Sequence, residues 1–172
     1  MIQIAPHGGT LVNRSLEGKA REEAKARAKH LAVLTLSDRE LSDLEMIATG
    51  ALSPLEGFMT GTDYESCLSK KRLSNGLVWA LPVTKSITAD EKTKISSQKE
   101  VAFSDREGNL LALLEIREIF PHDKKKQAHE VYGIEEEAHP GVAQIFRMGE
   151  WFVGGRISLF EFPKHTDFLE YR

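Results

Sequence analysis

Residues 34–58 read LTLSDRELSDLEMIATGALSPLEGF, and they predict a strand end, a helix and a shaped loop in direct succession. Ser37 and Glu40 match a capping box, in which the hydroxyl accepts from an early helix amide and the carboxylate accepts from the cap's own N–H. The apolar residues of the helix recur at helical spacing, and they are Leu41, Leu44, Ile47 and Ala48. Gly50 tolerates the positive φ at which a helix ends. We expect the rest of the fold to be organised around this stretch.

The loop after this helix, SPLEGF at residues 53–58, has the residues of a defined shape. Pro54 fixes one backbone torsion, and Gly57 supplies a permissive residue three positions later. Apolar residues flank both. We interpret the segment as a loop of fixed conformation.

The composition predicts one globular domain. The 172 residues are 28% charged and 41% hydrophobic, enough for one sizeable core. The net charge is −3 and the pI about 6.1, whereas nucleic-acid binders usually show a basic face or a high pI, so we expect no nucleic-acid partner. No apolar run approaches the roughly 18 residues of a membrane span, and the chain begins with no secretory signal pattern. Cys67 is the single cysteine, which excludes an internal disulfide and favours a cytoplasmic location.

Further elements follow from periodicity and capping signals. Helices are expected at 18–31, from Thr62 with Glu65 as its capping box, at 88–97 with the Thr88 and Glu91 box, at 121–132 and from His139. Strands are expected at 31–36, 77–84, 100–104, 110–120 and 151–162. Segment 77–84 is apolar on both alternating faces, so we expect a strand buried on two sides. Gly154 and Gly155 predict a bulge or a close backbone approach in the last strand.

Two basic segments raise the question of a phosphate-binding or RNA-binding patch. Helix 18–31 is cationic, but its Glu22→Lys25 and Glu23→Arg27 spacings are those of surface ion pairs. Its small-residue stripe of Ala20, Ala24, Ala28 and Leu31 predicts a helix at the surface. Residues 124–126 are three lysines, balanced by three glutamates at 135–137. Interleaved acids favour a solvated face over a nucleic-acid patch in both places.

The sequence contains no legible catalytic constellation. A phosphate loop, a dinucleotide fingerprint and a His-Glu-x-x-His motif are absent, and the His-Gly-Gly at 7–9 lacks a Gly-x-Ser-x-Gly elbow. His122, His129 and His139 with Glu130 could meet at a metal, but their spacings disfavour it. Cys67 lies among apolar residues and without a nearby histidine, which predicts a small core residue. We therefore expect no catalytic, cofactor-binding or metal residue in this chain.

Four segments resemble the N-terminal domain of ATP sulfurylase (sulfate adenylyltransferase) in order along the chain. They are residues 6–14 with His-Gly-Gly-x-Leu-Val-Asn-Arg, 36–58 with the Ser-Pro-Leu-x-Gly-Phe loop, 73–82 and 139–142, and Gly154-Gly155 fits as well. The resemblance implies an α+β, mainly β fold: a PUA-like small β-barrel with several short peripheral helices. It further implies one such domain at 1–162, with 163–172 as the start of a linker to a catalytic domain.

The family's catalytic motif, Gln-x-Arg-Asn-Pro-x-His-x-x-His, is absent from this sequence. The resemblance implies a parent reaction of ATP and sulfate with magnesium, and a chain that is inactive alone and scaffolds or docks the nucleotidyltransferase domain, in cis or in trans. A homo-oligomer is a further possible partner. The alternative is a freestanding PUA-like module that binds RNA or protein. If the chain is such an N-terminal domain, we expect the contact with the catalytic domain to be made by the 53–58 loop, at Ser53, Pro54, Leu55, Gly57 and Phe58.

Overall fold

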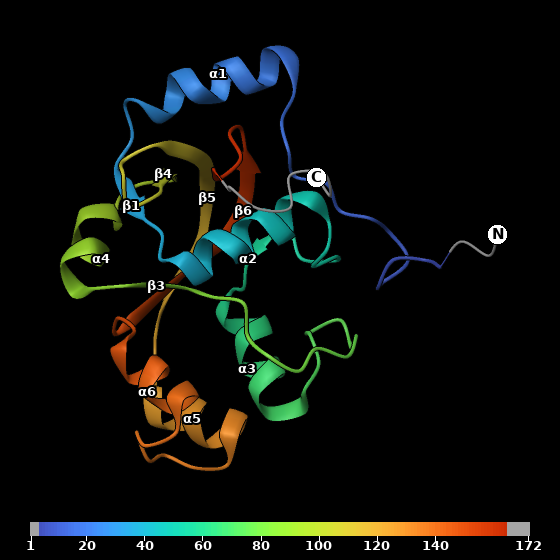
Figure 1. Cartoon of the computed structure of the whole chain (residues 1–172), viewed down its shortest axis with the longest axis vertical. Coiled ribbons are helices and arrows are strands. Elements are labelled where there is room, and N and C mark those ends of the chain that lie inside the picture. The colour runs from blue at the N-terminus through green and yellow to red at the C-terminus, as the bar shows by residue number, and fades with distance from the viewer. Residues whose placement is uncertain (1–3, 165–172) are drawn as a thin grey trace.

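The computed structural model describes residues 4–164, which contain six helices and six strands (Figure 1). The helices are α1 (Gly18–Ala28), α2 (Asp38–Thr49), α3 (Gly61–Lys70), α4 (Ala89–Ile95), α5 (Lys124–Tyr132) and α6 (Pro140–Arg147). The strands are β1 (Val33–Thr35), β2 (Gly57–Phe58), β3 (Lys85–Ile87), β4 (Glu100–Ser104), β5 (Leu110–Pro121) and β6 (Trp151–Leu159). The predicted α+β class is confirmed, although helices hold more of the described residues than strands do.

The strands form one curved, mixed sheet in the order β1-β4-β5-β6-β2. β1 runs parallel to β4, and the other pairs are antiparallel. β3 pairs with residues 151–153 of β6, and β2 pairs with residues 155–156 of the same strand, so the two short strands lie end to end along one edge. The long β5–β6 pair is thus the centre to which distant parts of the chain attach.

The 34–58 stretch folds as its local signals predict. The Ser37 hydroxyl accepts from the Glu40 amide, and the Glu40 carboxylate accepts from the Ser37 amide at 2.9 Å, which completes the capping box. α2 ends at Gly50, whose φ is 88°. Leu44 and Ile47 are fully buried and hold the helix against the sheet.

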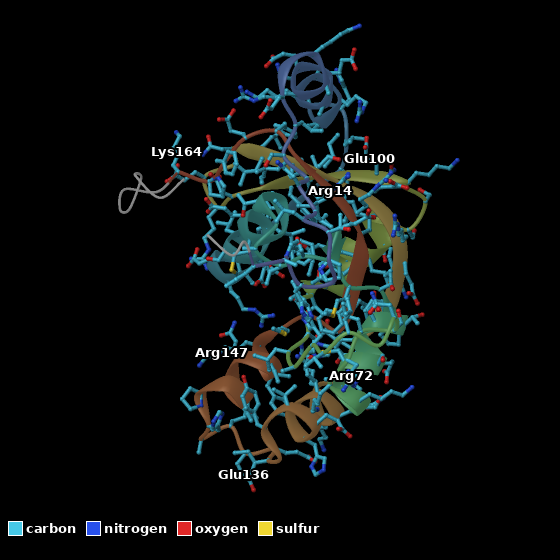
Figure 2. The ribbon with its side chains drawn as sticks, turned by 90° about the vertical axis from the view of Figure 1, so that its right-hand side faces the viewer. Arg14, Arg72, Glu100, Glu136, Arg147 and Lys164 are labelled. Carbon is cyan, nitrogen blue, oxygen red and sulfur yellow. The ribbon has the colours of Figure 1, made fainter. Side chains whose placement is uncertain are left out.

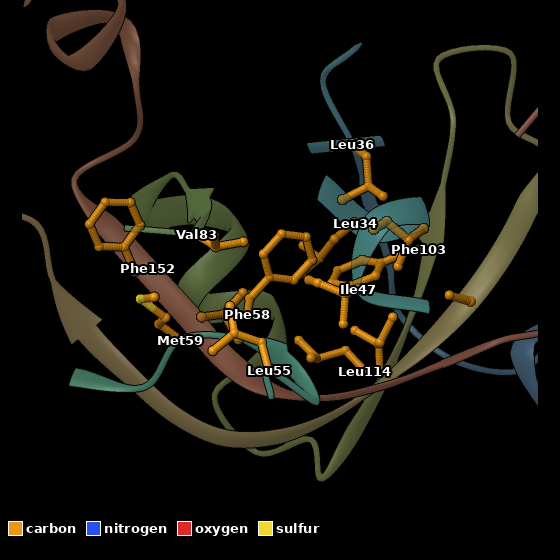
Figure 3. Packing of buried hydrophobic residues seen from close by; sticks show 14 of the residues in the cluster. Leu34, Leu36, Ile47, Leu55, Phe58, Met59, Val83, Phe103, Leu114 and Phe152 are labelled. Carbon is orange, nitrogen blue, oxygen red and sulfur yellow. The ribbon is translucent and has the colours of Figure 1, made fainter. Parts of the chain in front are cut away.

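The main core lies inside the curve of the sheet, between β5, β6 and α2 (Figure 3). Phe58 and Phe103 pack edge to face there, with ring centroids 5.7 Å apart. The predicted hairpin of β4 and β5 forms, and its apolar run is buried on both faces because successive side chains alternate. Leu114 joins the main core, whereas Leu113 packs with Ala24 and Ala28 of α1 on the other face.

Glycines at the β2–β6 contact allow backbones to approach more closely than a side chain would permit. A Cβ on Gly155 would lie 2.0 Å from the carbonyl oxygen of Glu115, and one on Gly57 would lie 1.8 Å from the oxygen of Gly155. The predicted close approach at Gly154 and Gly155 is confirmed. The bulge lies in the partner strand, where the register shifts between Ile116 and Glu118.

The prediction of a buried strand at 77–84 was wrong. Strand β3 begins at Lys85, and residues 77–84 run as an irregular segment held by Trp79 N–H to the Lys71 carbonyl at 2.9 Å. Val78 and Leu81 are 56% and 58% exposed. Apolar composition identified a segment suited to burial, but no described strand pairs with it to form a ladder.

The prediction that Thr62 caps a helix was also wrong. α3 begins at Gly61 with Thr60 at the N-cap position, and the Thr60 side chain makes no capping bond. The Gly61 amide instead donates to the Glu118 carboxylate of β5 at 2.8 Å. A residue of a remote strand satisfies this helix end, so the local capping pattern did not locate it.

The predicted ion pairs on the first helix differ from those in the structure, and α1 ends at Ala28 rather than residue 31. Arg21 and Lys25 both pair with Glu161, at 2.9 and 2.6 Å, and Arg27 lies 3.4 Å from Glu100. These contacts tie α1 to β4 and to the segment after β6, both far away in sequence. Ala24 and Ala28 are buried as expected, whereas Ala20 is exposed.

Candidate docking surface

The Ser53 side chain fixes the start of the 53–58 loop. Its hydroxyl donates to the Gly50 carbonyl at 2.7 Å and accepts from the Val12 amide at 2.9 Å. It is only 3% exposed. The following Ser53–Pro54 peptide bond is cis. Ser53 thus joins the N-terminal segment, the end of α2 and the loop.

The loop buries most of the side chains expected at an interdomain contact. Leu55 is 6% exposed and Phe58 only 2%, and both belong to the main core. Gly57 is buried against β6. Pro54 is half-buried and Glu56 is exposed. The interdomain contact stays a prediction, but in this structure Pro54 and Glu56 are the parts of the loop that a second domain could reach without opening the core.

A small hollow of about 200 Å3 lies beside this loop, lined also by Asp63, Ser74, Asn75 and Arg117. Its charged groups are engaged with their neighbours. Asp63 accepts from the amide and the hydroxyl of Ser74, at 2.9 and 2.6 Å, and Arg117 lies 3.4 Å from Glu56. These contacts hold the loop in shape and do not gather positive charge toward a bound phosphate.

A buried ion pair lies beneath α2, and sequence reasoning missed it. The Lys85 ammonium is 3.3 Å from the Glu40 carboxylate, and the two side chains are 5% and 8% exposed. Glu40 also accepts from the Ser86 amide at 3.0 Å, and Lys85 donates to the Thr35 carbonyl at 3.0 Å. The capping box explained Glu40 locally, and nothing in the sequence marked Lys85 as its partner. The pair fastens β3 to α2 and β1.

Cys67, His122 and His139 occupy structural positions. Burial raises the pKa of the Cys67 thiol to about 11, and its sulfur donates to the Trp79 carbonyl at 3.2 Å. His122 stacks on Phe152 with centroids 4.1 Å apart, and His139 caps α6 through the Gly141 amide. Within residues 4–164, no group of three or more His, Cys, Asp or Glu is arranged to hold a metal ion.

The basic segment at residues 124–126 is partly neutralised where it lies. Lys124 donates to the Phe146 carbonyl at 3.1 Å, and Lys126 pairs with Glu65 of α3. Since α1 likewise directs Arg21 and Lys25 at Glu161, two of the regions that could attract an anion have acids beside their bases. Nucleic-acid affinity depends on neutralising many phosphates, which this arrangement does not favour.

The curved sheet with peripheral helices defines a recognised class of domain. Residues 4–162 match the family of PUA-like domains, and the chain belongs to that family. Among its relatives is the sulfate adenylyltransferase of Symbiobacterium thermophilum, 47% identical over 170 residues, which are 99% of this chain and 43% of that protein. The sulfate adenylyltransferase of Synechococcus sp. (strain JA-3-3Ab) is 41% identical over 98% of this chain and 43% of its own length.

The likeness extends to proteins with further activities. A probable bifunctional SAT/APS kinase 2 of Sorangium cellulosum is 40% identical over 98% of this chain and 29% of its own length. A solved structure, the hexameric APS kinase from Thiobacillus denitrificans, superposes with a TM-score of 0.72 at 28% identity, over 98% of this chain and 29% of its own. The predicted resemblance to sulfate adenylyltransferase is therefore confirmed.

The chain spans less than half the length of the sulfate adenylyltransferases it matches. The similarity nevertheless runs through almost all of this chain, so it corresponds to one domain of those proteins. Of the helices in the described residues, none is long and apolar enough to cross a membrane.

Proposed function

We propose that this chain is the non-catalytic PUA-like domain of a sulfate adenylyltransferase and that it scaffolds or docks the catalytic domain. The observation that carries the proposal is the coverage: 99% of this chain aligns with only 43% of the Symbiobacterium relative. We also propose a cytoplasmic location, because a single cysteine suits a reducing compartment. The hexameric state of the structural neighbour supports an oligomeric assembly.

The chemistry of the parent reaction explains why this domain would need a partner. Sulfate attacks the α-phosphorus of ATP, giving adenosine 5′-phosphosulfate and pyrophosphate. Such transfers depend on positioned cations and on magnesium at the leaving group rather than on covalent help from the protein. In the described residues, Arg21, Lys25 and Arg156 are paired with acids, and no acidic cluster is arranged for a metal. The residues that hold ATP and magnesium would belong to the catalytic domain.

A pyrophosphate-release assay tests the proposal that this chain has no catalytic activity by itself. The purified 172-residue chain is incubated with ATP, sulfate and Mg²⁺, beside the full-length Symbiobacterium enzyme as the positive control. We expect no release above a protein-free blank. Turnover near that of the full-length enzyme, retained after further purification, would contradict the proposal.

A chimera tests the proposal that this chain scaffolds or docks the catalytic domain. This chain replaces its matching 170 residues in the Symbiobacterium enzyme, and the activity is compared with that of the enzyme lacking the region. We expect the chimera to be active and the shortened enzyme to lose activity or stability. A chimera no better than the shortened enzyme argues against a scaffold. Binding of the isolated chain to structured RNA, steeply weakened by salt, would favour the RNA-binding alternative.

A further inference from the structure

A groove of about 560 Å3 runs between α2, residues 79–83 and the α5–α6 pair. Its apolar lining comes from Leu52, Trp79, Leu81, Val131 and Ile145. Pockets of this size, apolar and edged by a few polar groups, are typical of binding sites. The 53–58 loop contributes no residue to its lining, so it is a surface separate from the predicted interdomain contact.

One wall of the groove is the segment whose composition predicted a buried strand. Leu81 is 58% exposed in the groove, and neighbouring Val78 is 56% exposed. Tyr132 of α5, on the opposite wall, is 41% exposed. Exposed apolar side chains that gather at a groove mark a surface that binds another molecule. The composition of residues 77–84 is suited to burial, but no described residue covers the side chains of Val78 and Leu81.

An unpaired cation lies in a hollow that adjoins the groove. Arg39 and Gln144 line both the groove and an adjoining hollow of about 120 Å3, which Arg147 also lines. The acids here each lie beside a cation: Glu40 pairs with Lys85, and Asp43 lies 3.5 Å from Arg39, although the buried Oδ2 of Asp43 accepts no hydrogen bond from any described residue. The guanidinium of Arg147, exposed at the end of α6, makes no hydrogen bond or ion pair within the described range 4–164. The charge left to be matched is therefore positive.

The last described residue lies on the same side of the molecule as the groove. Lys164, the last residue described, and Arg147 both project from the side that carries α2 (Figure 2). Lys164 therefore lies on the side of the molecule that holds the open groove. The relatives continue well beyond the part that this chain matches, which is 43% of their length.

We propose that the groove receives the rest of a longer sulfate adenylyltransferase, through apolar side chains that cover Leu81 and Trp79 and a carboxylate that pairs with Arg147. The inference rests on the proposed docking function, and it adds the surface and the chemistry of the contact. The occupant is an acidic and apolar protein surface.

The test uses the chimera described above with a protease site added after residue 172, so that the protein folds as a whole before it is cut. The dissociation constant of the two halves is then measured by dilution with a fluorescent label on one half. We expect Leu81→Ser and Arg147→Glu each to weaken association by roughly tenfold. The Arg147→Glu loss should shrink at high salt, because it is electrostatic.

Two control variants match these changes away from the groove. Val33→Ser removes an exposed apolar side chain from β1, and Lys94→Glu reverses a charge in the last turn of α4, as Arg147→Glu does in α6. We expect both controls to change the affinity by less than about twofold. Far-ultraviolet circular dichroism checks that all four variants remain folded.

The possible failures are distinguishable. If the halves stay associated and the groove variants behave like the controls, the groove inference is wrong and the docking function stands. If the unmodified halves show no affinity at all, both fail. If the groove variants instead dissociate a self-associated form of the 172-residue chain and leave the affinity of the halves unchanged, the occupant is a second copy and the inference is overturned.

Discussion

Replacing Lys85 by methionine would leave the buried carboxylate of Glu40 without its cation. Glu40 is 8% exposed on its side chain, so water cannot readily replace the ammonium that now lies 3.3 Å away. Removing one partner of a buried pair costs roughly 3–5 kcal/mol. Three donors remain to Glu40, the amide and hydroxyl of Ser37 and the Ser86 amide, so we expect a value near the lower end, about 3 kcal/mol.

A double-mutant cycle separates the pair from its surroundings. Glu40→Gln leaves Lys85 with the carbonyls of Thr35 and Ser86, at 3.0 and 2.9 Å, but with no counterion. The double variant removes both charges, so it should be more stable than the sum of the two single losses predicts. We expect a coupling free energy of roughly 1–3 kcal/mol.

Urea unfolding followed by circular dichroism measures the four free energies of unfolding, provided that the slopes agree. Arg39→Met is the control, because Arg39 lies on the same helix and its pair with Asp43 is more exposed. Its loss should be below about 1 kcal/mol. Additive single losses, or a Lys85→Met loss no greater than that of the control, would refute the reasoning that β3 is fastened to α2 by this pair.

Three further predictions concern single positions. Gly155→Ala should destabilise the domain by about 2–3 kcal/mol or more, because the added Cβ would lie 2.0 Å from the carbonyl oxygen of Glu115. Thermal unfolding measures this loss, and an unchanged melting temperature would contradict the close approach. Burial raises the pKa of Asp43 above its ordinary 3.8, so the folded state binds the proton of this carboxyl more tightly than the unfolded state does. As the pH rises through the window between the unfolded and folded pKa values, the free energy of unfolding of the wild type should therefore fall relative to that of Asp43→Asn. Parallel pH curves from urea unfolding would show that reasoning to be wrong. With its pKa at about 11, Cys67 should react with a disulfide reagent at about pH 8 far more slowly in the native protein than in denaturant, and equal rates would mean an accessible thiol.

The sequence alone was sufficient where the partners of an interaction lie within one turn or one hairpin. The Ser37–Glu40 and Thr88–Glu91 capping boxes formed as predicted, as did the hairpin whose Gly108 adopts φ 87°. In each case the groups that interact are a few residues apart, so the pattern contains the whole interaction. The motif resemblance likewise identified the family, because it depends on residue identities in order.

The candidate site was less predictable, because exposure is a property of the whole packed chain. The 53–58 loop was recognised as shaped, but only the packing shows that Leu55 and Phe58 point into the core while Pro54 and Glu56 face outward. The groove was not predicted at all. Its wall was taken for a buried strand, since apolar alternation indicates that a segment is suited to burial and cannot tell whether this chain or another protein covers it.

The contacts that the sequence did not predict are made between residues that lie far apart along the chain. Lys85 meets Glu40 across 45 residues, and Glu118 caps α3 across 57. Any of the chain's many lysines and glutamates could have formed such pairs, and local spacing does not distinguish among them. The 34–58 stretch by itself determined a capped helix and a rigid loop. The long β5–β6 pair determined what surrounds them, because β2 and β3 attach end to end along the free edge of β6.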